Sequence, residues 1–221
     1  FKYNRLTYTN MIKIQRTRVK ICGITNIEDA LNAVNAGADA IGLVFYEQSP
    51  RAVSVEQALK IVSVIPPFVS VVGLFVNSPV ASIKSILSQV RLDILQFHGD
   101  ETPNDCLQIN LPYSKAIRVK PDTNLIQCAL DFNSAKALLL DTFTEQAFGG
   151  TGQTFDWKLI PADLPKPIIL AGGLTADNVG HGIRQVKPYA VDVSGGVELS
   201  KGIKDAEKIT AFMQGVKNAS I

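Results

Sequence analysis

Eight short apolar segments, each rich in β-branched residues, recur along the chain and alternate with stretches of helical periodicity. This alternation is typical of parallel βα units and not of hairpins. Because eight strands are the number that closes a barrel, we predict an α/β fold of the (β/α)8, or TIM, barrel type, with surrounding helices. A doubly wound open sheet is the alternative, although it would leave two strand edges unpaired. The predicted strands cover residues 19–24, 40–45, 69–76, 94–99, 115–119, 137–141, 167–173 and 190–195.

Capping residues delimit several of the predicted helices. Asn26 is suited to be the N-cap of the first helix, and Gly37 is suited to stop it. Ser54 opens a second helix, while Ser78 and Pro79 form the N-cap and first position of a third. The last predicted helix carries an apolar stripe and is expected to cover the seam where the barrel closes. This stripe consists of Ala206, Ile209, Phe212 and Met213.

Length and composition indicate one folded domain. The chain has 221 residues, of which 46% are hydrophobic, and no Pro-rich linker divides it into two parts. We therefore assign residues 17–221 to a single barrel domain. Residues 1–16 have mixed polar character, and Met11 is suited to be a native start, so we expect an N-terminal extension that is disordered or non-native.

The distribution of charge and apolar residues narrows the class of partner. The formal net charge is +2 and no long basic run occurs, which argues against nucleic acid as a partner. No apolar run approaches the ~20 residues that a membrane-spanning helix needs, so no membrane partner is predicted. A small molecule is the expected partner, and a monomer is favoured over a homodimer.

The chain contains three cysteines, Cys22, Cys106 and Cys128, and none of them forms a CxxC pair. This number and spacing predict neither a disulfide framework nor a metal site. A reducing, cytoplasmic location fits best. Cys106 and Cys128 fall in predicted helices, where we expect them to serve as packing residues.

Three turns rich in glycine follow the last three predicted strands. Glycine lets main-chain N–H groups approach an anion closely, and the loops after strands seven and eight of a barrel are a common phosphate site. Any one turn alone is better explained as structural, but three at one face favour a phosphate site. The sequence has neither a dinucleotide GxGxxG nor a Walker motif, so no nucleotide cofactor is indicated. The candidate residues are Gly149, Gly150, Gly152, Gly172, Gly173, Ser194, Gly195 and Gly196.

Two reactive side chains end predicted strands at the same face of the barrel. Cys22 closes the first strand, where a thiol that populates its thiolate can act as a base. Asp141 closes the sixth, where partial burial would favour the neutral form that a general acid needs. The alternatives are a buried apolar cysteine and a capping or ion-paired aspartate.

Three further side chains are candidates for binding. Arg51 follows the second strand, and its guanidinium suits a carboxylate held by two hydrogen bonds. Asp192 on the eighth strand is expected either to accept hydrogen bonds from sugar hydroxyls or to pair with a lysine. His98 follows the fourth strand, and we favour a non-catalytic role for it in lining the pocket.

Seven motifs in order, KICGI, GLVFYEQSPR, LQFHG, LLLD, GGTGQTFDW, LAGGL and VDVSGGVE, resemble those of phosphoribosylanthranilate isomerase from tryptophan biosynthesis. The resemblance extends from Arg18 to Lys217. It implies a (β/α)8 barrel that uses no metal or organic cofactor. The implied reaction is an Amadori rearrangement of N-(5-phosphoribosyl)anthranilate to 1-(2-carboxyphenylamino)-1-deoxyribulose 5-phosphate.

The resemblance also implies roles for individual residues. Asp141 would be the general acid at the furanose ring oxygen, and Cys22 the general base at C2′. Arg51 would hold the anthranilate carboxylate, Asp192 would help to position the substrate, and the glycine turns would bind its phosphate. One departure is Gly195, where the family motif SSGVE usually has its second serine.

Two rival functions remain open at this point. Another phosphate-binding barrel such as indole-3-glycerol-phosphate synthase would be expected to use Lys and Glu as its acid–base groups. A phosphosugar-binding module without catalysis would retain the glycine turns, although Cys22 and Asp141 both count against it.

Overall fold

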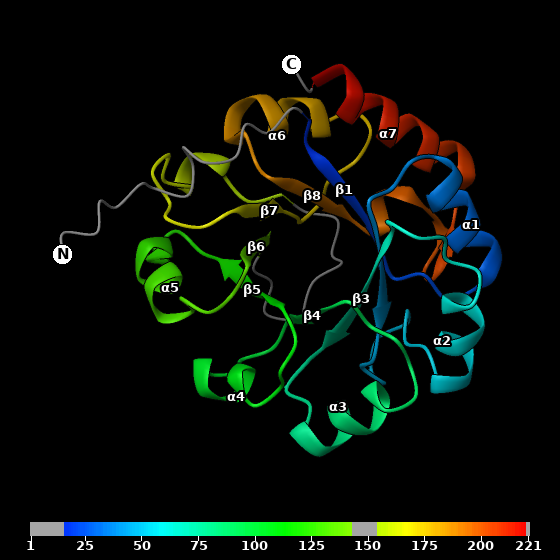
Figure 1. Ribbon diagram of the computed structural model, residues 1–221. Coiled ribbons are helices and arrows are strands. Elements are labelled where there is room, and N and C mark those ends of the chain that lie inside the picture. Colours follow the sequence, from blue (N-terminus) through cyan, green and yellow to red (C-terminus); the bar gives the residue numbers. More distant parts are fainter. Residues whose placement is uncertain (1–15, 143–153, 220–221) are drawn as a thin grey trace.

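The computed structural model describes residues 16–142 and 154–219 of the protein. Within them, eight parallel strands hydrogen-bond in sequence order and β8 pairs with β1, so the barrel is closed (Figure 1). This closure confirms the predicted (β/α)8 barrel and excludes the open sheet. The strands are β1 (Arg18–Cys22), β2 (Ala40–Val44), β3 (Ser70–Phe75), β4 (Ile94–Phe97), β5 (Tyr113–Val119), β6 (Ala137–Thr142), β7 (Ile168–Leu170) and β8 (Ala190–Val193).

Helices surround the barrel, and two of the predicted caps are present. The Asn26 side chain accepts a hydrogen bond from the Asp29 N–H, and Ser54 forms a capping box with Gln57. The third predicted cap is wrong by one residue, because Pro79 has an extended ψ of 140° and is itself the N-cap. The helices are α1 (Ile27–Asn35), α2 (Val55–Val62), α3 (Val80–Leu87), α4 (Pro103–Leu107), α5 (Leu125–Asp131), α6 (Val179–Val186) and α7 (Ala206–Ala219).

The chain departs from regular alternation after β6 and after β8. Between β6 and β7, the described residues 154–167 contain only a 3-10 turn, η2 (Trp157–Leu159). After β8, a second 3-10 turn, η3 (Gly195–Val197), leads into a hairpin of β9 (Glu198–Ser200) and β10 (Ile203–Lys204). The sequence pattern did not predict this hairpin.

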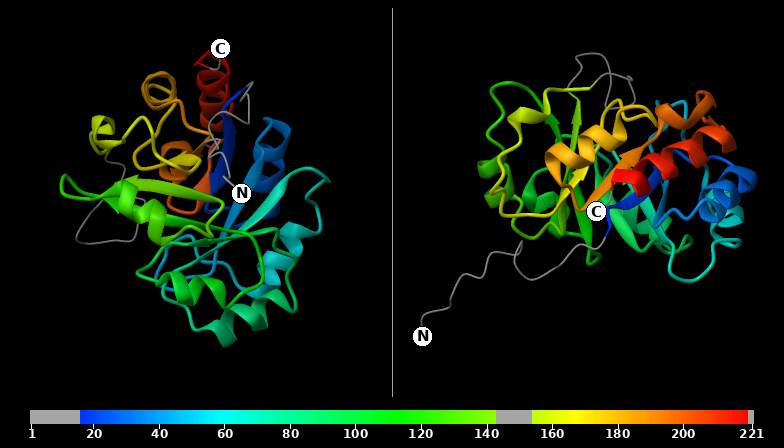
Figure 2. Two further views of the ribbon diagram at one scale, coloured as in Figure 1. Left: turned by 60° about the vertical axis from the view of Figure 1, so that its left-hand side comes forward. Right: turned by 90° about the horizontal axis from the view of Figure 1, so that it is seen from above.

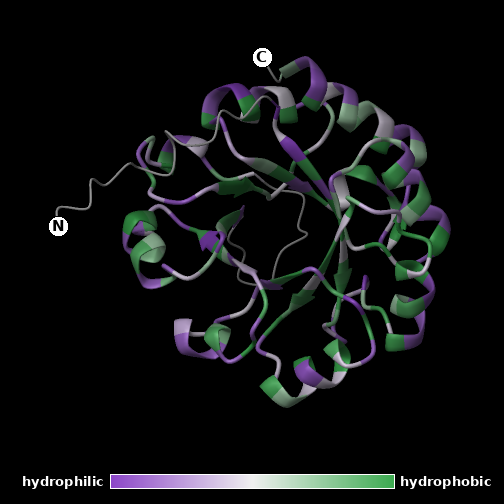
Figure 3. Cartoon of the chain, viewed as in Figure 1, coloured by the Kyte–Doolittle hydropathy of each residue, from purple (hydrophilic) through white to green (hydrophobic). Residues whose placement is uncertain are grey.

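Side chains of the strands alternate between the helices and the barrel interior. Ile21 and Leu43 belong to the large core between strands and helices, whereas Cys22, Val44 and Leu74 form a separate cluster inside the barrel. Figure 3 shows hydrophobic colouring along the strands and on parts of each helix. The alternation therefore directs the side chain of Cys22 to the interior.

The last helix completes the ring around the barrel. Helix α7 packs against both α1 and α6, so it covers the seam between β1 and β8, as predicted from its apolar stripe (Figure 2). Ile209 and Phe212 of this stripe are fully buried. The end of the barrel at the carboxyl ends of the strands is not covered by α7, and a binding site can form there.

Candidate active site

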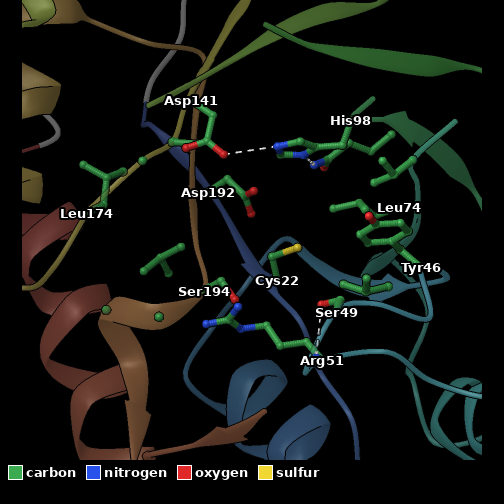
Figure 4. Close-up of a pocket in the computed structure, with 18 of the residues that line it drawn as sticks. Cys22, Tyr46, Ser49, Arg51, Leu74, His98, Asp141, Leu174, Asp192 and Ser194 are labelled. Carbon is green, nitrogen blue, oxygen red and sulfur yellow. Dashed lines mark hydrogen bonds and ion pairs between the residues drawn. The ribbon is translucent and has the colours of Figure 1, made fainter. Parts of the chain in front are cut away.

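A cavity of about 410 Å³ opens at the carboxyl ends of the strands, and both predicted reactive residues line it. Cys22 comes from β1 and Asp141 from β6, and Figure 4 shows their side chains facing the same cavity from different sides. Arg51, His98 and Asp192 line it as well. The barrel therefore brings together all five residues that were predicted to act on or bind the non-phosphate part of a substrate.

Cys22 is nearly buried, with 5% of its surface exposed, and opposes Gly42 of β2 in the strand register. Burial raises the pKa of its thiol, since a thiolate is poorly solvated there. Lys20 opposes this effect and Asp192 adds to it, and the net pKa lies above the usual value. The positive groups in the site are thus not sufficient to make Cys22 a thiolate at neutral pH in the free protein.

Asp141 is held by hydrogen bonds at both carboxylate oxygens. The backbone N–H of Thr142 donates to Oδ1 over 2.8 Å, and Nε2 of His98 lies 3.2 Å from Oδ2. The side-chain amide of Gln96 lies 2.8 Å from the other ring nitrogen, Nδ1. If Gln96 donates to Nδ1, the neutral ring carries its proton on Nε2 and donates it to Asp141. His98 therefore contacts a predicted catalytic residue as well as lining the cavity.

Arg51 does not present its whole guanidinium to the cavity. Its Nε and Nη2 donate to the two carboxylate oxygens of Glu198, each over 2.7 Å. Glu198 also pairs at 3.0 Å with Lys204, whose side chain is fully buried. Burial opposes ionisation of Glu198, but the hydrogen bond from Arg51 and the charge of Lys204 outweigh it and lower its pKa to about 2. The edge of Arg51 formed by Nη1 and Nη2 still has N–H groups for a second carboxylate.

Asp192 lines the cavity but is paired with a lysine, one of the two alternatives predicted for it. Its Oδ1 lies 2.8 Å from Nζ of Lys20, and both side chains are more than 90% buried. Burial lowers the pKa of Lys20, but Asp192 and Cys22 outweigh this effect and raise it above its ordinary value. Lys20 is therefore a charged ammonium group inside the barrel.

The glycine turns after β7 and β8 lie at one side of this cavity. Gly172 and Gly173 have positive φ values of 81° and 62°, which other residues rarely adopt, and both line the cavity. Ser194, Gly195 and Gly196 also line it. The remaining predicted phosphate residues, Gly149, Gly150 and Gly152, lie outside the described residues.

Position 195, where the family motif usually has serine, has room for a Cβ. A Cβ there would lie 3.5 Å from Nη2 of Arg51, which is an ordinary contact. The close packing of the turn therefore does not require glycine at this position.

Five residues of the site were not predicted as functional. Lys20 and Gln96 each lie two positions before a predicted residue, Cys22 and His98, so the period of two of a strand would have placed them on the same face. Glu198 ends the motif VDVSGGVE, but nothing in the local sequence links it to Arg51. The other two are Lys204 and Arg118, and Arg118 lies beside Asp141 in the strand register.

Within residues 16–142 and 154–219, no group of three or more His, Cys, Asp or Glu side chains is arranged to hold a metal ion. No helix in these ranges has the length and apolar character needed to cross a membrane. All three cysteines are free thiols, and Cys106 is completely buried in α4, in agreement with a packing role.

Comparison with known proteins identifies a family that covers most of the chain. Residues 19–215 match the family described as N-(5'phosphoribosyl)anthranilate (PRA) isomerase. A curated N-(5'-phosphoribosyl)anthranilate isomerase from Pseudomonas putida strain GB-1 is 61% identical over 202 residues, which cover 91% of this chain and 98% of the relative. 

Solved structures agree with the sequence match. Phosphoribosyl anthranilate isomerase from Thermotoga maritima superimposes with a TM-score of 0.85 at 43% identity, over 91% of this chain and 99% of that one. A structure of phosphoribosyl anthranilate isomerase in complex with reduced 1-(o-carboxyphenylamino)-1-deoxyribulose 5-phosphate gives a TM-score of 0.81 at 41% identity, with the same coverage. The chain therefore belongs to the phosphoribosylanthranilate isomerase family.

Proposed function

We propose that this chain catalyses the isomerisation of N-(5-phosphoribosyl)anthranilate in tryptophan biosynthesis, with Asp141 and Cys22 as its acid and base. The observation that carries the assignment of roles is that these two residues, from β6 and β1, line one cavity beside the glycine turns. Family membership supports the reaction and does not support the rival indole-3-glycerol-phosphate synthase.

The first proton transfer opens the sugar ring. The ring oxygen is a poor leaving group, so it needs a proton as its bond to C1′ breaks, and Asp141 in its acid form delivers that proton. The nitrogen lone pair then forms a C1′–N double bond, which gives a Schiff base. His98 and the Thr142 N–H keep the carboxyl group of Asp141 in one orientation for this step.

The second proton transfer is made by Cys22. The positively charged C1′–N double bond acidifies the C–H bond at C2′, so a thiolate is a sufficient base. The thiolate takes the proton from C2′, and the electron pair of that bond forms the double bond of an enolamine. Tautomerisation of the enolamine gives the ketone product. Because burial keeps the resting pKa of Cys22 above its usual value, activity should increase with pH through the ionisation of this thiol.

Binding groups surround the two proton-transfer residues. The free edge of Arg51 is suited to the anthranilate carboxylate, because it can still form two parallel hydrogen bonds while Glu198 holds the other edge. Glycine N–H groups after β7 and β8 are suited to the phosphate. Asp192, already paired with Lys20, is suited to contact sugar hydroxyls from the cavity wall.

The assignment is tested by Cys22→Ala and Asp141→Asn. Each variant is expected to lose turnover by about 10²–10⁴-fold or more, measured as the loss of fluorescence of freshly prepared phosphoribosylanthranilate. Binding of a reduced product analogue should change little, because both residues move protons. Cys128→Ala is the matched control, since Cys128 lies half-buried on α5 and does not line the cavity. Full activity of either active-site variant would contradict its role.

The phosphate contribution is measured with the same product analogue. Calorimetry should give weaker binding for the dephosphorylated form of the analogue. A non-catalytic phosphosugar-binding module would also bind the phosphorylated form more tightly, but it would not turn over substrate. Equal affinities for the two forms would rule out the phosphate cradle.

We also infer a monomer in the cytoplasm. The large exposed apolar side chains are spread over several elements, such as Leu59 of α2, Leu130 of α5 and Leu199 of β9, and apolar residues scattered in this way are normal on a monomer. Three free thiols suit a reducing compartment. Light scattering that gives twice the mass of the chain, or a non-cytoplasmic location on cell fractionation, would overturn the respective inference.

A further inference from the structure

Lys20 is a charged side chain inside the barrel, below the cavity, and no step of the reaction above uses it. It lies two residues before Cys22 on β1, so both side chains point to the barrel interior. Asp192 of β8 is its partner in the strand register and binds its Nζ over 2.8 Å. Only 7% of the Lys20 side chain is exposed. Burying two charges costs desolvation free energy, so stability alone does not explain an ion pair inside the barrel beside Cys22.

Gly42 of β2 brings the lysine and the cysteine together. A Cβ at this position would lie 2.8 Å from Sγ of Cys22 and 3.1 Å from Nζ of Lys20. The sulfur and the nitrogen therefore occupy the same small space above Gly42, which a larger residue would fill. The Lys20 ammonium group has three N–H donors, and Asp192 uses one of them in the described contact.

The charges around Cys22 come from four elements. Lys20 lowers the pKa of the thiol against the dominant effect of burial, and Asp192 raises it. Lys204 of β10 lowers it further, and Arg51 from the loop after β2 also interacts with Cys22. Elsewhere in the described lining of the cavity, the ionisable side chains are Tyr46, His98, Arg118 and Asp141. Lys20 is thus the cation with the largest influence on the thiol, and Asp192 limits that influence.

We propose that Lys20 is a positioning residue that allows Cys22 to carry negative charge inside the barrel, and that Asp192 sets how strongly it does so. The proposal rests on the assignment of Cys22 as the base. When Cys22 ionises, its thiolate shares the ammonium group with Asp192. When it takes the proton from C2′, it becomes a neutral thiol and the Lys20–Asp192 pair is again balanced.

Alkylation of Cys22 tests the proposal without substrate. Wild-type protein and variants are treated with iodoacetamide, a neutral reagent, from about pH 6 to about pH 10, and modification of each cysteine is followed by peptide mass spectrometry. In Lys20→Met, the rate at Cys22 at a fixed pH below its midpoint should fall about tenfold or more, equivalent to an upward shift of about one pH unit. In Asp192→Asn, the rate at Cys22 should increase, because the lysine loses its competing carboxylate.

Opposite changes of the Cys22 alkylation rate in Lys20→Met and Asp192→Asn distinguish this role from a purely structural one. A general loosening of the barrel would increase the rate in both variants. The double variant Lys20→Met/Asp192→Asn leaves no unpaired buried carboxylate and should still react more slowly than wild type. Lys20→Arg keeps the positive charge, so its alkylation rate at Cys22 should be closer to that of wild type than the rate in Lys20→Met. Cys128 serves as the internal control in every sample.

An unchanged rate at Cys22 in Lys20→Met, in a variant with a normal circular dichroism spectrum and thermal transition, would overturn the proposal. If Lys20→Met does not fold, Lys20→Arg and Asp192→Asn decide it, and unchanged alkylation in Asp192→Asn would then overturn it. Failure of the proposed function has a different signature, because Cys22→Ala would then turn over substrate while the alkylation rates still shifted.

Discussion

The contact between His98 and Asp141 gives the histidine a testable role at the scale of single residues. His98→Asn removes the hydrogen bond at Oδ2 of Asp141 but leaves the one from Thr142. Because a hydrogen bond to the carboxylate that forms as Asp141 gives up its proton contributes about 1.5–3 kcal/mol, we expect kcat to fall about tenfold or more while KM changes less. Steady-state kinetics provide the measurement, and His181→Asn on α6 is the matched control. A fall in kcat as large as that of Asp141→Asn would instead indicate that His98 itself transfers a proton.

The reactive residues of the site could be predicted from the sequence more readily than the ion pairs around them. Cys22 and Asp141 end apolar strands, and the barrel geometry fixes where such ends lie. The partners of Arg51 and Lys20 are Glu198 and Asp192, which come from distant parts of the chain. No local pattern encodes such pairs, so the ion pairing of Arg51 and the raised pKa of Cys22 became evident only from the structure.

At the scale of elements, the turns after β7 and β8 are held together by Gly196. A Cβ at this position would lie 1.9 Å from the carbonyl oxygen of Leu174, so Gly196→Ala must push the two turns apart. We expect KM for the phosphorylated substrate to increase about tenfold or more, since a displaced turn aims its N–H groups poorly at the phosphate. Gly195→Ala is the matched control, because its Cβ would be 3.5 Å from the nearest atom. Equal KM values in these neighbouring variants would contradict a close-packed cradle.

Elements with strong periodicity were predicted well, and short irregular ones were not. The capping residues Asn26 and Ser54 were correct, because side-chain hydrogen bonding at a helix start depends on the local sequence. The hairpin of β9 and β10 was missed, since strands of three and two residues have too few positions to establish alternation. This hairpin carries Glu198 and Lys204, so the charged cluster that holds Arg51 depends on the least predictable element.

At the scale of the whole molecule, the closed barrel could be predicted by counting eight alternating units in the sequence. The electrostatic contribution to the stability of the barrel could not be predicted in this way. Glu198 is the clearest case, because its pKa is held at about 2 against an ordinary value of 4.5. The unfolded protein binds a proton at Glu198 more readily than the folded protein does. The resulting stabilisation is therefore complete above about pH 4.5 and is lost as the pH falls towards about 2, and it amounts to at most about 3 kcal/mol.

The difference between wild type and Glu198→Gln should reveal this contribution. Urea unfolding at a series of pH values is expected to give a gap in the free energy of unfolding that is largest above about pH 4.5 and narrows on acidification, because only the wild type loses the charge. The variant also leaves the buried Lys204 without its carboxylate, which adds to the gap at neutral pH. Glu56→Gln, which removes a fully exposed partner of Lys60, should show almost no gap at any pH. Parallel curves for wild type and Glu198→Gln would mean that the cluster of Arg51, Glu198 and Lys204 orients the site without stabilising the barrel.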